Sequence, residues 1–477
     1  MKSTEKVFRF FEDISRIPRS SGDEKAISDY LLHFAAERGL EAFRDNCFNV
    51  IIKKPATVPG CTCAPVIIQG HTDMVYVRES GCRRQYEDGL SLVYKDGWLT
   101  AEGTSLGADN GIAVAYALAL LDSGDILHPD IEAVFTVSEE VGLIGAANLD
   151  YSKLKGKYLL NIDTEDEGVF YTSCAGAFRN EIRIPIVREN LEGRVSLTVN
   201  ISGLKGGHSG MEINEGRANA LSLLGRLLSR ISADVRIASL KSEGKTNAIA
   251  NNAAAELFVE EARIDEVERA IKDMEAEFKS EYGGRDTICI KTARGEKLRA
   301  FCYNEESGKK VAAALMLIPC GVISMSHDIP ELVETSANPA YLEESENELA
   351  IFSSTRSSVG SRKAELRAKY KAVADLCGGI SCCSADYPQW EYRENSPLRE
   401  LAMKTYEELF GKKAQTRAIH AGLECGYFDK NISGVDIISY GPDISDVHTP
   451  QEKANIESIE RMWLFTSALL EKLAKLG

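Results

Sequence analysis

Acidic side chains and histidines recur in this chain directly after short apolar stretches, where the β-strands of an α/β fold would end. The carboxyl ends of such strands form the crevice in which open α/β sheets bind ligands. Carboxylate and imidazole donors that converge there suit zinc, and also manganese or cobalt. The residues at these positions are His71 and Asp73, Glu139 and Glu140, Asp163, and His448.

A further carboxylate, Asp109, lies in the glycine-flanked segment GADNG, which leads into an apolar helix. Two metal ions held about 3.5–4 Å apart usually share a bridging carboxylate and a water. Two histidines and three carboxylates, one of them bridging, are enough ligands for such a pair. The residue types alone therefore indicate a metal site that could hold two ions.

Two short spacings add detail to this site. Residues two apart on an extended segment face the same way, so Asp73 can orient the ring of His71 through its second nitrogen. Glu139 and Glu140 are neighbours in the chain, and neighbouring side chains leave a turn in different directions. One of the two can therefore bind metal while the other acts as a base toward a water whose pKa the metal lowers.

Each of these signals is weak by itself. An isolated His-x-Asp makes a structural hydrogen bond as often as it belongs to a metal site, and an isolated Glu-Glu is usually a solvated turn. A single loop histidine such as His448 lies on the surface more often than it binds metal. The interpretation as a site depends on all of these residues occurring at the same end of the predicted sheet.

The composition of the chain restricts its class. The 477 residues are 44% hydrophobic and 27% charged, which is typical of globular domains and excludes disorder. With a formal net charge of −16, the protein is not expected to bind nucleic acid or an anionic membrane. No apolar run approaches the ~18 residues that span a bilayer. The N-terminus has no secretory signal pattern, and the cysteines are too sparse for a disulfide scaffold, so we expect a cytoplasmic protein.

Strands and helices are predicted to alternate in the first part of the chain and again near its C-terminus, which indicates an α/β sheet covered by helices. Residues 111–121 (GIAVAYALALL) are apolar nearly all round, as expected of a buried helix. Strands are predicted over residues 65–69, 131–137, 157–162 and 435–439, and further helices over residues 24–38 and 456–473.

The middle of the chain has a different pattern. Residues 194–202 alternate between apolar and polar side chains, as in a sheet with one solvated face. Helices are predicted over residues 217–230 and 264–278, and a comparable series of strands and helices recurs over residues 286–376. We interpret this region as two βα repeats that form an inserted, antiparallel α+β domain.

The patterns together predict two domains. Residues 1–186 and 388–477 would form a catalytic domain around a mixed sheet covered by helices. Residues 187–387 would form an inserted lid and dimerisation domain. No low-complexity linker marks either boundary.

Motifs of one known family run nearly end to end along the chain and keep their order. They are IPRSSGDE (17–24), GHTDMV (70–75), SLGADNGIA (105–113), VSEEVGLIGA (137–146), NIDTEDEG (161–168), GGHSGMEI (206–213), GRANA (216–220), HAGLECG (420–426) and HTPQEKANI (448–456). On these motifs the chain resembles the co-catalytic dinuclear zinc peptidases of the aminoacylase/carnosinase type. Within that group it is most similar to the bacterial aminoacyl-histidine dipeptidases, also described as cytosol non-specific dipeptidases.

The resemblance implies two divalent metal ions, most often Zn²⁺, with Mn²⁺ or Co²⁺ as alternatives. His71 and Asp163 would hold one ion, and Glu140 and His448 would hold the other. Asp109 would bridge the two.

The resemblance also implies how the site works. Asp73 would support His71 from behind, and Glu139 would be the general base that takes a proton from the water between the metals. The peptide bond between Asp109 and Asn110 would be cis.

Substrate contacts are implied on shorter motifs. His208 would come from the lid of a partner subunit and polarise the substrate carbonyl, which makes a homodimer the expected assembly. Asn247 and Arg356 would hold the C-terminal carboxylate of a small peptide substrate. His420 and Gly422 would line the pocket on the side of the catalytic domain.

The resemblance therefore predicts metal-dependent hydrolysis of dipeptides, of Xaa-His type or of broad specificity. The nearest alternative is an N-acyl amino acid deacylase on the same scaffold, with the same metals and base. A non-catalytic binding or scaffold protein is a third interpretation. The presence of Glu139 disfavours it, because a general base has no evident structural use.

Overall fold

The computed structural model describes residues 3–231 and 235–475, and these residues divide into two compact units. Unit 1 comprises Met1–Cys174, Trp390–Ile419 and Leu423–Gly477, and unit 2 comprises Ala175–Gln389 and His420–Gly422. Each unit has its own hydrophobic core. The chain therefore forms an α/β unit from its two ends and a second unit from its middle, which confirms the predicted fold class.

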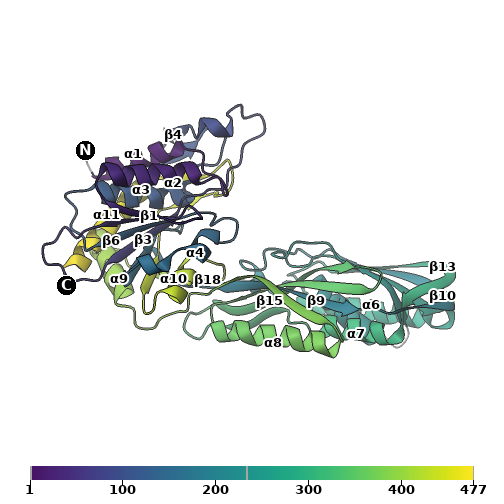
Figure 1. Cartoon of the computed structure of the whole chain (residues 1–477). Coiled ribbons are helices and arrows are strands. Elements are labelled where there is room, and N and C mark those ends of the chain that lie inside the picture. Colours follow the sequence, from purple (N-terminus) through teal and green to yellow (C-terminus); the bar gives the residue numbers. More distant parts are fainter. Residues whose placement is uncertain (1–2, 232–234, 476–477) are drawn as a thin grey trace. The chain divides into compact units, whose positions relative to one another are not determined.

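Unit 1 is built on a mixed sheet (Figure 1). Its central strands β6, β3, β7 and β19 run parallel to one another, and β8 and β18 also pair parallel. The pairs β1–β2, β2–β6 and β19–β8 are antiparallel. In spatial order the strands are β1 (Glu41–Arg44), β2 (Val50–Lys54), β6 (Ile131–Thr136), β3 (Val66–His71), β7 (Tyr158–Asn161), β19 (Asp436–Ser439), β8 (Val169–Cys174) and β18 (Gln415–Ile419).

Both faces of the middle of this sheet are covered, which explains why β3 and β6 are buried along their whole length. On β3, Val66 and Ile68 join one core while Ile67 joins another on the opposite face. Helix α10 (Cys425–Asn431) covers the face of Ile67 and contacts α4 (Ile144–Asn148). The other face packs against α1 (Ser3–Ser15), α2 (Lys25–Glu37), α3 (Ala108–Asp122), α9 (Pro397–Phe410) and α11 (Ile456–Ala474).

Helix α3 lies directly on the middle of the sheet, as its apolar sequence predicts. A Cβ atom on Gly70 of β3 would lie 2.4 Å from the Cβ of Ala113. Only glycine fits there, and the close approach brings the start of α3 next to the end of β3.

A small second sheet in unit 1 joins two distant parts of the chain. Its strands, in order, are β20 (Ile444–Ser445), β21 (Lys453–Asn455), β5 (Trp98–Ala101) and β4 (Leu92–Lys95). The pairing of β21 with β5 places the segment that contains His448 beside the segment that leads into α3. The sequence analysis did not predict these short strands.

Unit 2 contains two antiparallel sheets (Figure 1). All four of its described helices contribute to its main hydrophobic core. One sheet has the order β11 (Val235–Lys241), β12 (Ala253–Glu260), β10 (Arg188–Ser202) and β13 (Cys289–Tyr303). The other has the order β14 (Gly321–Met325), β15 (Val333–Glu344), β16 (Glu348–Ser357), β9 (Gly176–Pro185) and β17 (Ile380–Tyr387). The helices are α5 (Ala220–Ile231), α6 (Ile264–Tyr282), α7 (Glu305–Leu317) and α8 (Gly360–Leu376).

The division between the units differs from the predicted boundaries at residues 175–186, 388–389 and 420–422. Residues 175–186, assigned from sequence to the catalytic domain, belong to unit 2, because β9 pairs on one side with β16 and on the other with β17. Residues 420–422 also belong to unit 2, although the chain on both sides of them is in unit 1. Local patterning could not show either point, because both depend on the partners that a segment finds far away in the sequence.

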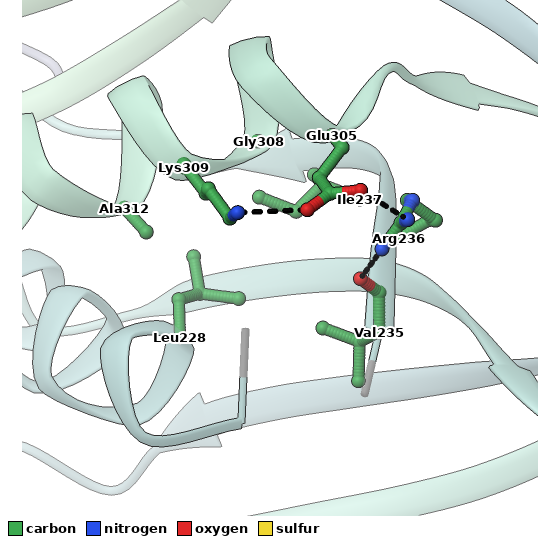
Figure 2. A pocket seen from close by; sticks show the side chains of 8 residues that line it. All are labelled: Leu228, Val235, Arg236, Ile237, Glu305, Gly308, Lys309 and Ala312. Atoms are coloured by element: carbon green, nitrogen blue, oxygen red, sulfur yellow. Dashed lines mark hydrogen bonds and ion pairs between the residues drawn. The ribbon is translucent and has the colours of Figure 1, made fainter. Parts of the chain in front are cut away.

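A small pocket in unit 2 lies between α5, β11 and α7 (Figure 2). Its charged side chains pair with one another: Lys309 donates to Glu305 at 2.7 Å, and Arg236 donates to the same carboxylate at 3.2 Å. The pocket contains none of the predicted site residues. In the described part of the chain, no helix combines the length and apolar character needed to cross a membrane.

Candidate functional site

The predicted metal ligands lie together in unit 1, although they come from separate segments of the chain. One is the last residue of β3, two follow the ends of β6 and β7, one is in the first turn of α3, and one lies between β20 and β21. In that order the residues are His71, Glu140, Asp163, Asp109 and His448.

The carboxylate of Asp109 lies at the centre of this cluster. Its Oδ1 is 3.1 Å from Nε2 of His71, and its Oδ2 is 3.2 Å from Nε2 of His448. Nε2 of His71 is also 3.4 Å from Oδ1 of Asp163, and Nε2 of His448 is 2.8 Å from Oε1 of Glu140. Each oxygen of Asp109 therefore faces a different His–carboxylate pair.

The peptide bond between Asp109 and Asn110 is cis, which confirms that expectation. The side chain of Asn110 connects the loop to two neighbouring strands. Its Oδ1 accepts the backbone N–H of His71 at 3.1 Å, and its Nδ2 donates to the carbonyl oxygen of Ile162. Since Ile162 precedes Asp163, one amide side chain connects the segments of three candidate ligands.

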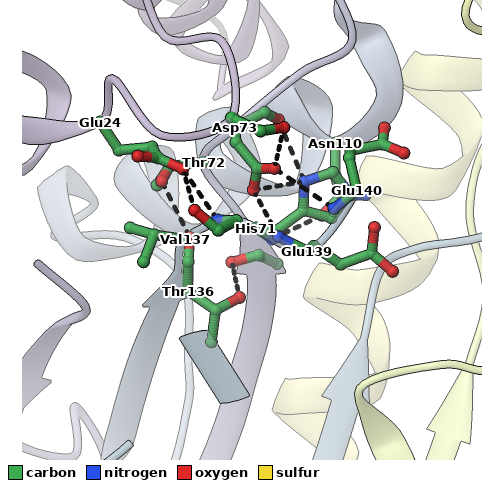
Figure 3. A network of polar contacts seen from close by, with 12 residues as sticks. Glu24, His71, Thr72, Asp73, Asn110, Thr136, Val137, Glu139 and Glu140 are labelled. Carbon is green, nitrogen blue, oxygen red and sulfur yellow. Dashed lines mark hydrogen bonds and ion pairs between the residues drawn. The ribbon is translucent and has the colours of Figure 1, made fainter. Parts of the chain in front are cut away.

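Asp73 is buried beneath the cluster and binds two different parts of it (Figure 3). Nδ1 of His71 lies 3.0 Å from the Asp73 carbonyl oxygen and 3.4 Å from its Oδ1, while Nε2 faces Asp109. The Asp73 carboxylate also accepts the backbone N–H groups of Glu139 at 3.0 Å and Glu140 at 3.3 Å. Asp73 thus fixes the ring of His71 and also the turn that follows β6, a second role that sequence spacing does not reveal.

The turn after β6 is held from its other side by Glu24. Oε1 of Glu24 accepts both the backbone N–H of Ser138, at 2.9 Å, and its hydroxyl, at 2.7 Å (Figure 3). Ser138 has a φ of 50°, in the left-handed region that non-glycine residues seldom adopt. This conformation lets Glu139 and Glu140 leave the turn in different directions.

Glu139 lies within reach of the cluster and is not part of either pair around Asp109. Donor atoms of Glu139, Glu140 and His71 all lie within 4.8 Å of one another. Burial raises the pKa of Glu139 well above its usual value, and the charge of Asp163 raises it further. A carboxylate in this position can accept and hold a proton, which is the property that general-base chemistry requires.

The donor set fits a pair of divalent ions. Two imidazoles and three carboxylates converge, and two three-residue groups share Asp109. Hydrogen bonds to Asp109 and Glu140 raise the pKa of His448 to about 10, so the cluster strongly stabilises positive charge. Nitrogen and oxygen donors arranged around one shared carboxylate are typical of co-catalytic zinc, manganese or cobalt sites.

His208 lies in unit 2, in a loop that hydrogen-bonds its own ring. Nδ1 accepts the backbone N–H groups of Gly210 at 3.3 Å and of Met211 at 3.1 Å. Burial and the nearby Arg356 lower the pKa of His208, which favours the neutral ring. Because Nδ1 accepts these two bonds, the neutral ring carries its proton on Nε2. The imidazole therefore presents an N–H donor and not a base.

The other predicted substrate residues surround this loop. A Cβ atom on Gly210 would lie 2.9 Å from the carbonyl oxygen of His420 and 3.0 Å from Nε of Arg356. The carbonyl oxygen of Asn247 accepts the N–H of Ser209 at 2.8 Å. Unit 2 thus brings together His208, Arg356, His420 and the turn that carries Asn247.

The predicted location of His420 and Gly422 on the catalytic-domain side is wrong, since both residues belong to unit 2. Nε2 of His420 lies 2.7 Å from Oγ of Ser336 on β15, and a Cβ on Gly422 would lie 2.6 Å from the ring of Tyr387. Burial, reinforced by the charge of Arg356, lowers the pKa of His420 to about 3.

Several residues of the site were missed by the sequence analysis. Ser336 and Tyr387 lie outside every recognised motif, and Tyr387 accepts a hydrogen bond from Arg356 at 3.2 Å. Arg19, Glu424 and Glu452 do lie inside recognised motifs and are each fully or almost fully buried. The sequence did contain a signal for these three residues: each is a charged residue inside a recognised motif and has no role assigned to it.

Comparison with known proteins shows the family of this chain. Residues 67–472 match Peptidase family M20/M25/M40. The cytosol non-specific dipeptidase of Escherichia coli (strain K12) is 32% identical over 478 residues, which cover 99% of this chain and 98% of that protein. The chain belongs to Peptidase family M20/M25/M40 and is a hydrolase that acts on peptide bonds.

Solved structures extend the comparison to three dimensions. The aminoacylhistidine dipeptidase from Vibrio alginolyticus has a TM-score of 0.93 and 33% identity, covering 98% of this chain and 96% of that one. A tripeptidase from Staphylococcus aureus has a TM-score of 0.57 at 16% identity, covering 99% of both chains, and therefore shares the fold alone.

The environment of His420 predicts an unusual titration. Because its folded-state pKa is about 3, against about 6.5 in an unfolded chain, the ring should remain neutral from pH 8 down to pH 4.5. Its contribution to stability is then fully present above about pH 6.5 and decreases as the pH falls below that value, where the unfolded state binds the proton. Imidazole NMR signals, assigned by their loss in His420→Gln, measure this, and a midpoint near 6.5 would contradict the described environment.

Proposed function

We propose that this protein hydrolyses dipeptides, of Xaa-His type or of broad specificity, with two bound divalent metal ions. The observation that carries the proposal is Asp109, whose two oxygens face two separate His–carboxylate pairs beside the free Glu139. The similarity over nearly the full length to a cytosol non-specific dipeptidase and to an aminoacylhistidine dipeptidase supports dipeptides as substrates.

The residues that would hold the ions follow from the two pairs. His71 and Asp163 would hold one, Glu140 and His448 the other, and Asp109 would contribute one oxygen to each. Zn²⁺ suits this donor set best, and Mn²⁺ or Co²⁺ also fit. When bound, the ions would supply Lewis-acid polarisation of the peptide carbonyl and would acidify water at neutral pH.

Glu139 would carry the protons of the reaction. As the general base, it would take a proton from the attacking water, so that the oxygen of that water bonds to the peptide carbon. It would then deliver the proton to the nitrogen of the departing amine. Its position supports this role, because donor atoms of Glu139, Glu140 and His71 lie within 4.8 Å of one another while Glu139 is outside both pairs around Asp109.

His208 would stabilise the charge that develops on the carbonyl oxygen. Its Nδ1 is occupied by backbone N–H groups, which leaves the Nε2–H free to donate to that oxygen. Preorganised donors of this kind usually make the largest electrostatic contribution in such reactions. Arg356 and Asn247 would bind the C-terminal carboxylate of the substrate, and His420 and Gly422 would line the same pocket.

An N-acyl amino acid deacylase would use the same metals and base, and differs in accepting a blocked amine. We expect metal-loaded enzyme to hydrolyse Ala-His or β-Ala-His and to leave N-acetyl amino acids nearly untouched. Parallel assays of both substrate types, at matched enzyme and metal concentrations, measure the ratio. Faster turnover of the acetylated substrates would make the deacylase the correct assignment, and inactivity toward both would overturn the proposal.

We expect Glu139→Gln to retain its metal ions and to lose turnover. The amide is nearly isosteric but cannot accept a proton, and general-base catalysis alone contributes roughly 10²–10⁴-fold. Metal content by elemental analysis and initial rates measure the two properties. Asp163→Ala is the comparison variant: it removes a ligand and should lose metal first. A metal-loaded Glu139→Gln enzyme with near-normal activity would exclude Glu139 as the base.

We also propose that the protein is a cytoplasmic homodimer in which His208 completes the site of the partner subunit. His208 belongs to unit 2, whereas every proposed metal ligand belongs to unit 1. A two-fold dimer would serve both sites identically. The cytoplasmic location is supported by the similarity to a cytosol dipeptidase.

Mixing two inactive variants tests this arrangement. A hybrid of His208→Ala and Glu139→Gln subunits has one site with an intact Glu139 and an intact His208 from its neighbour. If His208 acts in trans, about half of the site activity of the hybrids should return after subunit exchange. If it acts within its own chain, every site retains one lesion and mixing restores nothing. Each variant incubated alone through the same exchange is the control.

A further inference from the structure

The loop that carries Asp109 is bound by a carboxylate from a distant part of the chain. Oε2 of Glu452 accepts the backbone N–H groups of Leu106 at 2.8 Å and Gly107 at 2.9 Å. Its Oε1 accepts those of Ala108 at 2.8 Å and Asp109 at 3.4 Å. One side chain, only 2% exposed, thus binds four consecutive N–H groups that end at the candidate bridging ligand.

These four donors would otherwise have no acceptor. They precede or begin helix α3, and the first N–H groups of a helix have no partner within it. The residue at the cap position is Gly107, which has no side chain to accept them. A carboxylate also complements the positive end of the helix dipole. The carboxylate of Glu452 therefore acts as the N-terminal cap that the loop itself does not supply.

Arg19 holds the opposite side of the same loop. Its Nη2 donates to the carbonyl oxygen of Gly107 at 2.7 Å, and its Nη1 donates to that of Thr72 at 3.0 Å, next to His71. A Cβ on Gly107 would lie 2.6 Å from Nη2 of Arg19, so the guanidinium occupies the space that any other residue would need. The loop is bound through its N–H groups by Glu452 and through its carbonyl by Arg19.

Glu452 also belongs to the segment that provides another candidate ligand. It follows His448 by four residues, its N–H donates to the carbonyl oxygen of Thr449 at 3.1 Å, and β21 begins directly after it. The same turn thus carries a ligand of one pair and the clamp on the bridging carboxylate. A shift of this turn would move His448 and Asp109 together.

We propose that Glu452 is a positioning residue that holds Asp109 where each of its oxygens can reach one metal ion. The inference rests on the proposed metal site and adds a residue that binds no metal itself. Outer partners of this kind typically change metal affinity or activity by 10–100-fold when they are replaced. Because Asp109 faces both pairs, loss of the hydrogen bonds from Glu452 lowers the binding affinity for both ions and not for one alone.

Unit 1 offers a matched control for the purely structural effect of such a carboxylate. Glu132, at the other end of the sheet, is 3% exposed and accepts the backbone N–H groups of Lys155 at 2.8 Å and Gly156 at 2.9 Å. It also accepts a hydrogen bond from Lys53 at 3.0 Å. Glu132 resembles Glu452 in burial and in binding backbone N–H groups, and its partners Lys155 and Gly156 precede β7, at the opposite end of that strand from Asp163.

The experiment compares Glu452→Gln, Glu132→Gln and the wild type as metal-stripped full-length proteins. Binding of Zn²⁺ and Co²⁺ is measured by competition with a chromophoric chelator, and thermal unfolding is recorded without metal. We expect both variants to unfold at a lower temperature than the wild type. Only Glu452→Gln should bind both metal equivalents 10–100-fold more weakly, while Glu132→Gln should remain within about twofold of the wild type.

Unchanged metal affinity in folded Glu452→Gln would overturn the inference, and so would an equal loss in Glu132→Gln. If Glu452→Gln does not fold, Glu452→Asp replaces it: the charge is kept but the reach is shorter, and the same loss of affinity is expected, with an unchanged affinity again overturning the inference. A wild type that takes up no divalent ion overturns the proposed function itself, together with this inference. If the wild type and Glu452→Gln both bind two ions with equal affinity, the positioning role is overturned and the proposed function stands.

Discussion

The arrangement of the site depends on one carboxylate with two partners. Asp109 can face His71 and His448 at once only if the end of β3, the start of α3 and the segment before β21 lie together. Close packing at Gly70, the side chain of Asn110, and the pairing of β21 with β5 each contribute to that requirement. The first two of these interactions join segments about forty residues apart, whereas His448 lies 339 residues from Asp109. The site is therefore a property of the folded unit and of no single motif.

Charge explains why so many buried polar groups surround this carboxylate. Burying a carboxylate without partners is costly, and here Asp73, Glu24 and Glu452 each meet backbone N–H groups instead. The same bonds hold the turns from which Glu139, Glu140 and Asp109 project. The hydrogen bonds that stabilise these buried carboxylates therefore also set the positions of the candidate ligands. A substitution that removes one of the buried carboxylates changes the ligand geometry as well.

The sequence predicted the parts of the fold that depend on local pattern. The apolar runs of β3, β6, β7 and α3 are predicted, and so are the positions of His71, Glu140 and Asp163 at or just after the ends of three strands. The strands β4, β5, β20 and β21 were not predicted, because they are short and, unlike the equally short β7 and β19, are not almost fully buried apolar runs. The backbone role of Asp73, the partner of His420 and the clamp by Glu452 were also missed. Each depends on a contact across the fold, to which residue types and spacing give no guide.

The excursion of residues 420–422 into unit 2 has a consequence for modularity. Ser336 has its buried partner in His420, and the N–H of Ala175 donates to the carbonyl oxygen of Ala421 at 3.1 Å. A fragment cut out as residues 175–389 would lack both partners and would contain a hole where the imidazole lies. Unit 2 therefore cannot be exchanged between relatives as one continuous segment. Replacing residues 175–389 alone would leave residues 420–422, which complete the interior of unit 2, from the other parent.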